Sequence, residues 1–567
     1  MDIITPKNLF ILLKTSTFMI FSQALLAQDQ NSIMPCSKDY IPSSANYKFQ
    51  EKNNDLPLVV GTINKIHITR LQIFNEERPE ENNLIYRFAN RVHILTGEPY
   101  IRQELLFKEG DVYDDKKIEE SSRNLRELDH LFDASIQIVG NCTEKIDIEV
   151  VTKDLWSLGL DFSIGRAGGE TTSRFGISET NLLGKGKKIS IIRKKDSERD
   201  SSRFTYRDNN ILGSRFRGLI RLEDSEDGSH QAAHYFLPFY ELDSRLSWGY
   251  RLEKFDQIDT QYFRGEDVSE TRHIIEDYNL FIGKSDGLKQ GIVKRWTLGF
   301  RYRQDRFKAG DDLPEPLIKP RDTRLSYPYL KYETIENRYT SATNLEQIYR
   351  TEDIHLGYTF RSSLGYAHQD FGADLNRLVL STYFADTLIY NEKSYMTHTA
   401  SFSGLWNFRD HVSEDVLLDY ELKLIRRQRH NRAFVAQFSA TISENLNSNQ
   451  QLTLGGKSGL RGFNRRYQSG DKRLSLTLEE RQYTDYQLFN LAYLGFAAFI
   501  DIGRAWESGN QETPDKILAN IGVGIRLAST KTEGGRVIHI DFAYPLTNHE
   551  DPELDSFQLY VTIKNTL

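Results

Sequence analysis

From Trp156 to the end of the chain, the sequence is a long series of short segments in which apolar and polar residues alternate. Alternation with a period of two is the pattern of a β-strand whose two faces have different surroundings. Turn residues such as Asn209-Asn210 and Asp227-Gly228 separate the segments. At roughly 25 residues for each strand and its turn, residues 157–567 would form about 16 strands, although a count of the segments is nearer to ~20. No helical layer is predicted here, which restricts this part to an all-β architecture.

The last segments show the alternation most clearly, and their charges lie on one face. In Leu474–Arg481 the leucines point to one side and Glu479 to the other. Ala492–Gly503 likewise places Asp501 opposite its isoleucines. A membrane barrel suits this pattern, because an arginine or lysine that faced mid-bilayer would cost about 2–4 kcal/mol. A soluble sandwich would instead bury the apolar faces against each other. The sequence favours a mainly β fold, with a transmembrane antiparallel β-barrel over residues 155–567.

The first 27 residues have the features of a secretory signal peptide. Lys7 supplies a positive charge, a mainly apolar stretch follows, and Ala27 is a small residue suited to cleavage. A membrane anchor is the weaker interpretation, because Lys14 interrupts the apolar stretch. Residues 28–56 are polar and are expected to form a linker.

Export would place the only two cysteines, Cys36 and Cys142, in an oxidising compartment. A disulfide between them would tie the polar segment to the domain that follows. The alternative is two unpaired thiols, because spacing along a sequence does not show proximity.

Between residues 57 and 154 the periodicity becomes that of a small α+β domain. Ile66 lies in an alternating, strand-like segment, and apolar residues then recur at helical spacing over residues 84–95. Asp114 is placed to cap a further helix, and two alternating segments close the domain. The predicted sheet has an open edge, which can bind an extended client by adding a strand. The alternative is that residues 28–56 cover this edge.

Several function classes have no support in the sequence. The formal net charge is −7 and the sequence pI is near 6.1, so no basic footprint indicates nucleic-acid binding. After the N-terminus no run of about 18 apolar residues occurs, which excludes a helical membrane protein. His230 and His234 lack the glutamate of a zinc-protease helix, and no G-x-S-x-G nucleophile motif is present. We therefore expect neither an enzyme nor a protein that binds a metal or another cofactor.

A glycine-rich stretch near the C-terminus contains the best candidate for a functional residue. Arg461, followed by Gly462 and Phe463, lies in a predicted loop over residues 453–473. Glycine tolerates positive φ, so this loop can fold back into the barrel. A guanidinium keeps its charge and can bind a carboxylate through two parallel hydrogen bonds.

Strand parity provides two carboxylates for that arginine. Glu479 and Asp501, the latter in the pattern F-I-D-I-G that ends at Gly503, both fall on the lumen face. A contact with Arg461 would hold the loop against the inner wall. The alternative is a solvated loop arginine and two unrelated lumenal acids.

This set of residues resembles the BamA/TamA superfamily of outer-membrane assembly and translocation barrels, of the bacterial surface antigen type. The R-G-F loop, an E-x-R at Glu479–Arg481 and an F-x-D-x-G at Phe499–Gly503 follow in the family's order. The turn formed by Asn181, Gly184 and Gly186 resembles the family's N-x-L-G-x-G turn at the start of the barrel.

A second resemblance lies in the N-terminal domain. The phrase from Leu105 to Ile138, with its acidic-glycine turn, helix, Leu-Phe pair and strand, is similar to a POTRA domain, and one copy is evident. The resemblance implies sixteen barrel strands and a lumenal contact of Arg461. It also implies a weak seam between the first and last strands, near 158–164 and 557–563.

The predicted function is that of an outer-membrane protein assembly, insertion or translocation factor. Its partners would be outer-membrane lipid, unfolded or partly folded client proteins and periplasmic accessory proteins. The expected location is the outer membrane of a Gram-negative bacterium, with the N-terminal domain in the periplasm. Two alternatives remain: a passive porin or structural barrel, and a dedicated two-partner secretion translocator, which usually has two periplasmic repeats.

Overall fold

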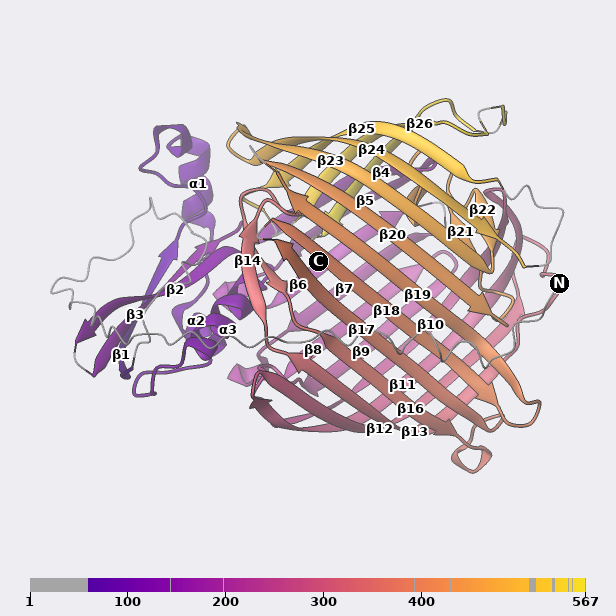
Figure 1. The fold of residues 1–567 in the computed structure, drawn as a ribbon, viewed down its shortest axis with the longest axis horizontal. Helices are drawn as coiled ribbons and strands as arrows, with labels where there is room; N and C mark the ends of the chain where they lie inside the picture. The colour runs from indigo at the N-terminus through magenta and orange to yellow at the C-terminus, as the bar shows by residue number, and fades with distance from the viewer. Residues whose placement is uncertain are drawn as a thin grey trace, which may run out of the picture.

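The computed structural model describes residues 60–565 apart from 143, 197, 392, 429–430, 509–515, 533–535, 549 and 553. A small α+β domain stands at one end of a large barrel (Figure 1). The predicted signal peptide, the linker and Cys36 lie outside the described residues, as does the Cys142 side chain, and with them the proposed disulfide. We call the barrel end that faces the small domain the near end and the opposite end the far end.

The N-terminal domain is a three-stranded sheet in the order β1-β3-β2, with β1 parallel and β2 antiparallel to β3. The sequence predicts two helices where the described residues of the domain form three, because Gly97 and Pro99 end one helical run and begin another. The elements of the domain are β1 (Thr62–Leu71), α1 (Leu84–Val92), α2 (Glu98–Glu104), α3 (Asp115–Arg126), β2 (Leu131–Cys142) and β3 (Lys145–Asp154).

Helix α3 follows from its sequence in the expected way. The side chain of Asp114 accepts a hydrogen bond from the backbone N–H of Lys116 and so caps the first turn. Ile118 and Leu125 then face the sheet and join a core with Ile146 and other apolar residues. Among the described residues, none of the helices is long and apolar enough to cross a membrane.

A buried histidine makes the stability of this domain depend on pH. His130 follows α3, and burial lowers its pKa to about 4. In the unfolded chain its pKa would be about 6.5, so below that pH the unfolded state gains a proton that the folded state does not accept. The domain should therefore lose up to about 3 kcal/mol of stability between pH 6.5 and pH 4. Hydrogen exchange in α3 and β2 across this range should show the loss in the native protein and a smaller loss in His130→Gln. Equal losses in both proteins would contradict the prediction.

The barrel is closed and antiparallel. It contains β4 to β13, β16 to β20 and β23 to β27, which cross the wall obliquely (Figure 1). Their bounds are β4 (Leu158–Ala167), β5 (Glu170–Glu179), β6 (Lys188–Lys195), β7 (Asp200–Asp208), β8 (Arg217–Ser225), β9 (Gly228–Leu237), β10 (Leu246–Phe263), β11 (Glu266–Lys289), β12 (Ile292–Ala309), β13 (Thr323–Glu336), β16 (Thr359–Ala367), β17 (Arg377–Asn391), β18 (Ser394–Asn407), β19 (Val412–Arg427), β20 (Arg432–Glu444), β23 (Lys472–Leu488), β24 (Ala492–Trp506), β25 (Leu518–Ser529), β26 (Arg536–Pro545) and β27 (Gln558–Asn565).

The prediction of about 16 strands is wrong, because the barrel has 20. It assumed a uniform length for each strand and its turn. Strands β4 to β9 contain only 8 to 10 residues each. Short turns such as Gly168-Gly169 join several of these six strands, so this part of the wall uses fewer residues per strand than the assumed length. The number of alternating segments in the sequence is closer to the number of strands in the barrel.

The predicted alternation is present in the wall. In β24, Phe496 and Ile500 are exposed on the outer surface, whereas Phe499 and Asp501 are buried inside the barrel. The same arrangement in β25 leaves Val523 exposed. An apolar outer band with charged residues inside is the arrangement that a bilayer requires.

A hairpin outside the wall links the barrel to the N-terminal domain. It consists of β14 (Tyr339–Thr343) and β15 (Thr351–His355), which lie between β13 and β16 at the near end. Arg126 of α3 donates to Asp353 at 2.7 Å, and the Thr351 hydroxyl donates to Asp133 of β2 at 2.8 Å. A second short pair, β21 (Leu452–Leu454) and β22 (Gln468–Gly470), closes the base of the glycine-rich loop.

Candidate functional site

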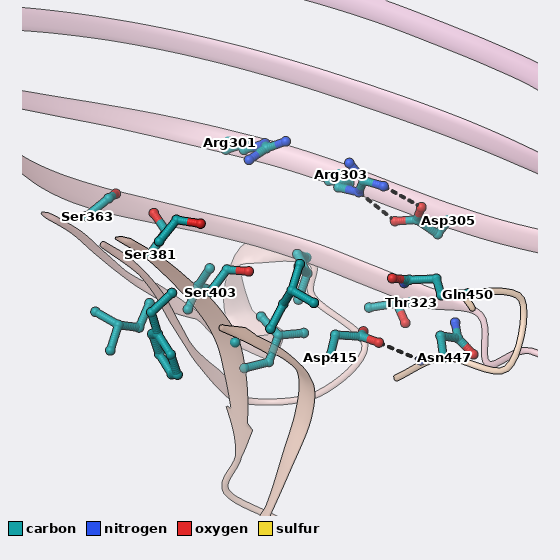
Figure 2. A pocket seen from close by; sticks show the side chains of 18 of the residues that line it. Arg301, Arg303, Asp305, Thr323, Ser363, Ser381, Ser403, Asp415, Asn447 and Gln450 are labelled. Atoms are coloured by element: carbon teal, nitrogen blue, oxygen red, sulfur yellow. Dashed lines mark hydrogen bonds and ion pairs between the residues drawn. The ribbon is translucent and has the colours of Figure 1, made fainter. Parts of the chain in front are cut away.

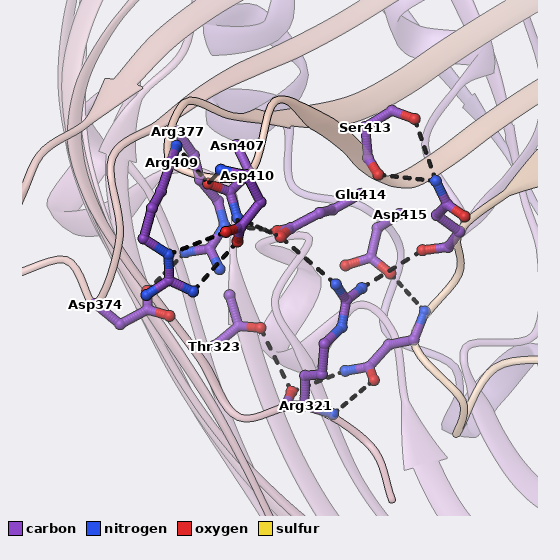
Figure 3. Close-up of polar contacts among 12 residues, drawn as sticks. Arg321, Thr323, Asp374, Arg377, Asn407, Arg409, Asp410, Ser413, Glu414 and Asp415 are labelled. Carbon is purple, nitrogen blue, oxygen red and sulfur yellow. Dashed lines mark hydrogen bonds and ion pairs between the residues drawn. The ribbon is translucent and has the colours of Figure 1, made fainter. Parts of the chain in front are cut away.

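The glycine-rich loop enters the barrel from the far end, where it connects β20 to β23 over residues 445–471. Its first residues are fixed to neighbouring far-end loops. The backbone N–H of Asn447 donates to Asp415 at 2.7 Å, and its side-chain amide donates to the carbonyl of Arg321 at 2.9 Å. Figure 3 shows the adjoining cluster, in which Glu414 accepts from Arg377 at 2.6 Å. The start of the loop is therefore held to the wall before the chain turns inward.

Arg461 lies at the centre of the site and is almost fully buried. Its Nε and Nη2 atoms donate to the two oxygens of Asp501 at 3.0 and 2.9 Å. Its Nη1 atom donates to Glu479 at 2.9 Å and to Asp541 at 3.0 Å. The guanidinium also stacks on Phe499, 3.3 Å from the ring centre. The structure thus brings Arg461 together with both acids that strand parity placed in the lumen.

Two more arginines balance the buried charge. Arg481 donates to Glu479 at 2.8 Å, and Arg526 contacts Glu479 at 3.2 Å and pairs with Asp541. Three arginines and three carboxylates therefore meet in one cluster, which we call the lumenal cluster. Charges removed from water are tolerated only when paired and hydrogen-bonded in this way.

Sequence reasoning missed Asp541 and Arg526 as parts of this site. Both alternate with apolar residues in their strands, so strand parity places them on the lumen face. Parity does not give the height of a residue along a strand, which depends on the register between strands. That register places Gly524 opposite Asp541 and so brings Arg526 within reach of it.

The other residues of the motif have steric roles. A Cβ atom on Gly462 would lie 2.5 Å from the Cβ of Asn520, so only glycine allows this approach of the loop to β25. At Gly503 a Cβ would lie 2.7 Å from the carbonyl oxygen of Leu474. Phe463 is fully buried in an apolar cluster with Leu454. The loop is thus fixed by packing as well as by charge.

A third set of contacts joins the loop to the start of the barrel. The backbone N–H of Arg465 donates to the carbonyl of Gly168, in the turn between β4 and β5, at 3.0 Å. Its side chain donates to Glu170 at 2.6 Å. The inward loop therefore contacts strands on both sides of the point where the barrel closes.

The closure between β27 and β4 differs from every other junction in the wall. Among the described residues, the two strands register at a single position, Val561 opposite Arg166. By contrast, β4 pairs with β5 along its whole length, from Leu158 to Ala167. The few backbone contacts make this junction, which we call the seam, the weakest line in the barrel.

The turn of Asn181, Gly184 and Gly186 lies at the near end, where it joins the barrel to the N-terminal domain. The Asn181 side chain donates to Thr96 at 2.9 Å and accepts from the N–H of Gly186 at 2.8 Å. The carbonyl of Gly184 accepts from the N–H of Gly97 at 2.8 Å. The turn is therefore a docking contact between the two parts of the chain, which sequence reasoning did not predict.

A glycine substitution can test this docking contact. Gly186 has φ +62°, and an added Cβ would lie 2.2 Å from the Tyr100 hydroxyl. Gly213, in the equivalent turn between β7 and β8, has φ +74° with no atom within 4 Å of an added Cβ. Gly213→Ala should cost about 1–2 kcal/mol in backbone strain alone, whereas Gly186→Ala should cost about 1–3 kcal/mol more from the overlap. Protease cleavage between the domain and the barrel should rise only in Gly186→Ala. Equal cleavage in the two variants would contradict the assignment of this turn as a docking contact.

The lumen also contains a cavity of about 980 Å³ beside β10 to β19 (Figure 2). Its charged lining is largely paired: Arg303 donates twice to Asp305, both at 2.8 Å. His273 lies between Asp259 and Asp305 at 2.7 and 2.9 Å. Paired charges give no strong field of one sign, so the cavity does not show the selectivity of a dedicated ion pore. Within the described residues, no group of His, Cys, Asp and Glu is arranged to hold a metal ion.

Comparison with known families matches both parts of the chain. A family model described as the Omp85 superfamily domain matches residues 181–564. A second model, described as a POTRA, surface antigen variable number repeat, matches residues 93–153. Together they cover most of the barrel and most of the small domain.

Individual relatives are more distant. A protein of Treponema pallidum (strain Nichols), named as an outer membrane protein assembly factor, is 26% identical over 179 residues, which are 30% of this chain and 20% of that protein. BamA from Haemophilus ducreyi lacking POTRA domains 1–3 has 13% identity and a TM-score of 0.38, covering 89% of this chain and 84% of that one. CdiB from Escherichia coli has 14% identity and a TM-score of 0.43, covering 89% of this chain and 76% of that one. Both scores are low, so neither likeness carries an argument about function.

Proposed function

Because the chain belongs to the Omp85 superfamily, a family of outer-membrane assembly and transport barrels, we propose that it inserts other proteins into the outer membrane or translocates them across it. It does so without a catalytic step of its own. The POTRA-like domain lies in the periplasm and recruits the client. The barrel then passes the client through the seam between β27 and β4.

The seam is the observation that carries this proposal. A barrel that serves only passive diffusion gains nothing from a weak junction between two strands. Each unpaired backbone group that faces lipid costs several kcal/mol, because no water is present to form the missing hydrogen bond. In the part of the two strands that the structure describes, one residue pair, Val561 and Arg166, is in register. A client strand can supply the missing backbone partners to either edge as it enters the membrane. The seam thus favours an assembly role over a passive porin.

The N-terminal sheet supports recruitment of an extended client. In the described part of the chain, no strand pairs with the outer edge of β2, since the sheet ends there in the order β1-β3-β2. An unpaired edge presents a row of backbone donors and acceptors to a peptide in extended conformation. Asp133, close to that edge, already contacts the β14–β15 hairpin, so a client bound here would lie beside the near-end mouth.

Depletion of the protein, followed by proteomics of the outer membrane and the secreted fraction, tests the proposal. Loss of several integral outer-membrane proteins would support insertion, and loss of one secreted protein would favour the two-partner secretion alternative. Unchanged levels in both fractions, together with a change in small-solute uptake, would overturn the proposal in favour of a passive channel. Re-expression of the native chain is the control and should restore the profile.

A further inference from the structure

Helix α1 exposes its large apolar side chains, the reverse of a helix that packs them on a domain core. Asn90 is buried, where its side chain bonds both the N–H and the carbonyl of Phe74. The four large apolar side chains of the helix are instead in solvent, with exposed fractions of 78% for Leu84, 75% for Ile85, 64% for Phe88 and 49% for Val92. Helical spacing puts these four on one side of α1, within an arc of about 100°. Such an exposed patch on a folded domain marks a surface that another phase or molecule covers.

The ends of the α1 segment are fixed to the rim of the barrel on both sides of the seam. Before and within the helix, the Glu80 carbonyl accepts from Asn490 at 2.9 Å, and Tyr86 donates to the carbonyl of Phe489, in the turn between β23 and β24, at 2.6 Å. After the helix, the backbone N–H of Gly97 donates to the carbonyl of Gly184, in the turn between β5 and β6. The segment therefore spans the near ends of the strands from β24 to β5, and Figure 1 shows α1 just beyond the ends of β23 and β25.

The position of this rim in the bilayer identifies what covers α1. The near-end turns bound the apolar outer band of the barrel, so they lie at the membrane surface. The turn that holds α1 is itself apolar and exposed, at Phe489 and Leu491, and β24 continues it with exposed Phe496 and Ile500. The apolar face of α1 thus extends the lipid-facing surface of the wall beyond the strand ends.

The charges of the helix complement a lipid surface. Arg87 and Arg91 are exposed and follow helical spacing along one flank of the apolar arc. Arginines beside an apolar face are the pattern of a helix that lies in the headgroup region, where they bind anionic phospholipid. A binding groove for an apolar peptide would not need this flanking positive charge.

We propose that α1 is a membrane-docking helix, which lies in the leaflet on the near side of the outer membrane directly below the seam. Its apolar face enters the acyl boundary and its arginines contact phosphate headgroups. The contact fixes the N-terminal domain to the membrane and disturbs the lipid at the place where the barrel wall is weakest. This goes beyond the proposed client function and requires only that the barrel spans a bilayer.

The test measures lipid contact at one residue of the full chain. A fluorescent nitrobenzoxadiazole label is attached to Phe88→Cys, with Cys36 and Cys142 changed to serine, and the protein is reconstituted in phosphatidylethanolamine–phosphatidylglycerol vesicles that contain acyl-chain nitroxide lipid. The same label on Lys116→Cys, an exposed residue at the start of α3, is the control. The nitroxide should quench the label at residue 88 and leave the label at residue 116 bright. Equal quenching at both positions would overturn the proposal. The proposal would also be overturned if the nitroxide did not quench the label at residue 88 and the fluorescence of that label changed only when an extended apolar peptide was added.

A second arm separates headgroup contact from apolar insertion. Arg87→Gln with Arg91→Gln should reduce quenching of the residue 88 label in vesicles with phosphatidylglycerol and have little effect in vesicles of phosphatidylcholine alone. The same loss in both vesicles would contradict the headgroup contact. Both arginines are exposed, so the substitutions leave the fold of the domain intact, which an unchanged Phe74–Asn90 region in hydrogen exchange can verify.

Discussion

Replacing Arg461 with alanine is expected to release the inward loop and to destabilise the barrel by about 3–5 kcal/mol, the usual result when one partner of a buried ion pair is removed. Arg461 satisfies Asp501, Glu479 and Asp541 at once, and its loss leaves the lumenal cluster with one unbalanced negative charge. The first measurement is the midpoint of urea unfolding in detergent, monitored by gel mobility. The second is protease cleavage within residues 452–470. Under the proposed function, client proteins should also be lost from the outer membrane.

Three matched variants separate the causes. Arg461→Lys keeps the charge but loses the planar fork, so it should fall between the native protein and Arg461→Ala. Arg461→Met with Asp501→Asn removes one charge of each sign and should recover part of the stability. Arg409→Ala removes an exposed arginine paired with Asp410 and should change stability by less than about 1 kcal/mol. If Arg461→Ala behaved like Arg409→Ala, the interpretation of the cluster as a lock would be wrong.

The sequence predicts this site better than its surroundings, and the reason is the range of each interaction. Glu479 and Asp501 follow from strand parity, which depends only on local backbone geometry. The contribution of Arg526 depends on register between β25 and β26, which is a property of paired strands rather than of either strand alone. The strand count failed for a related reason: turn lengths, not alternation, determine how many strands a given length of chain makes.

The N-terminal domain shows a different limit. The helical spacing of Leu84, Phe88 and Val92 predicts a helix with one apolar side, and α1 is that helix. Periodicity does not say what an apolar face packs against. In a soluble domain the apolar face of a helix packs against the core, but in α1 Asn90 lies on the buried side. The exposure of these side chains shows that the apolar side faces outward at the barrel rim.

The lumenal cluster and the N-terminal domain are also physically connected. Arg481, which pairs with Glu479, donates to the carbonyl of Leu345 in the β14–β15 hairpin at 3.3 Å. The same hairpin contacts the domain through Thr351 and Asp133. A change in the domain on client binding would therefore reach the lumenal cluster through one hairpin. Coupling of this kind requires that the hairpin adopt two states.

A disulfide across the seam should abolish client transfer while leaving the fold intact. Arg166→Cys with Val561→Cys places the two thiols at a registered pair of β4 and β27. Directly opposed Cβ atoms in an antiparallel pair are about 4.5–5.5 Å apart, close to the roughly 3.5–4.5 Å that a disulfide needs. The bond would prevent the strands from separating, so under oxidising conditions new outer-membrane proteins should fail to appear, and a reductant should restore them.

The control is a disulfide where the wall is already continuous. Val523→Cys with Phe542→Cys joins β25 to β26 at a registered pair within a complete ladder. Both double variants are made with Cys36 and Cys142 changed to serine, so that no native thiol competes. The control bond should leave client levels unchanged with or without reductant, because those strands do not part in the proposed mechanism. Full client transfer by a quantitatively cross-linked seam would show that clients do not pass between β27 and β4. The weak register at Val561 would then have to be explained by flexibility of the wall alone.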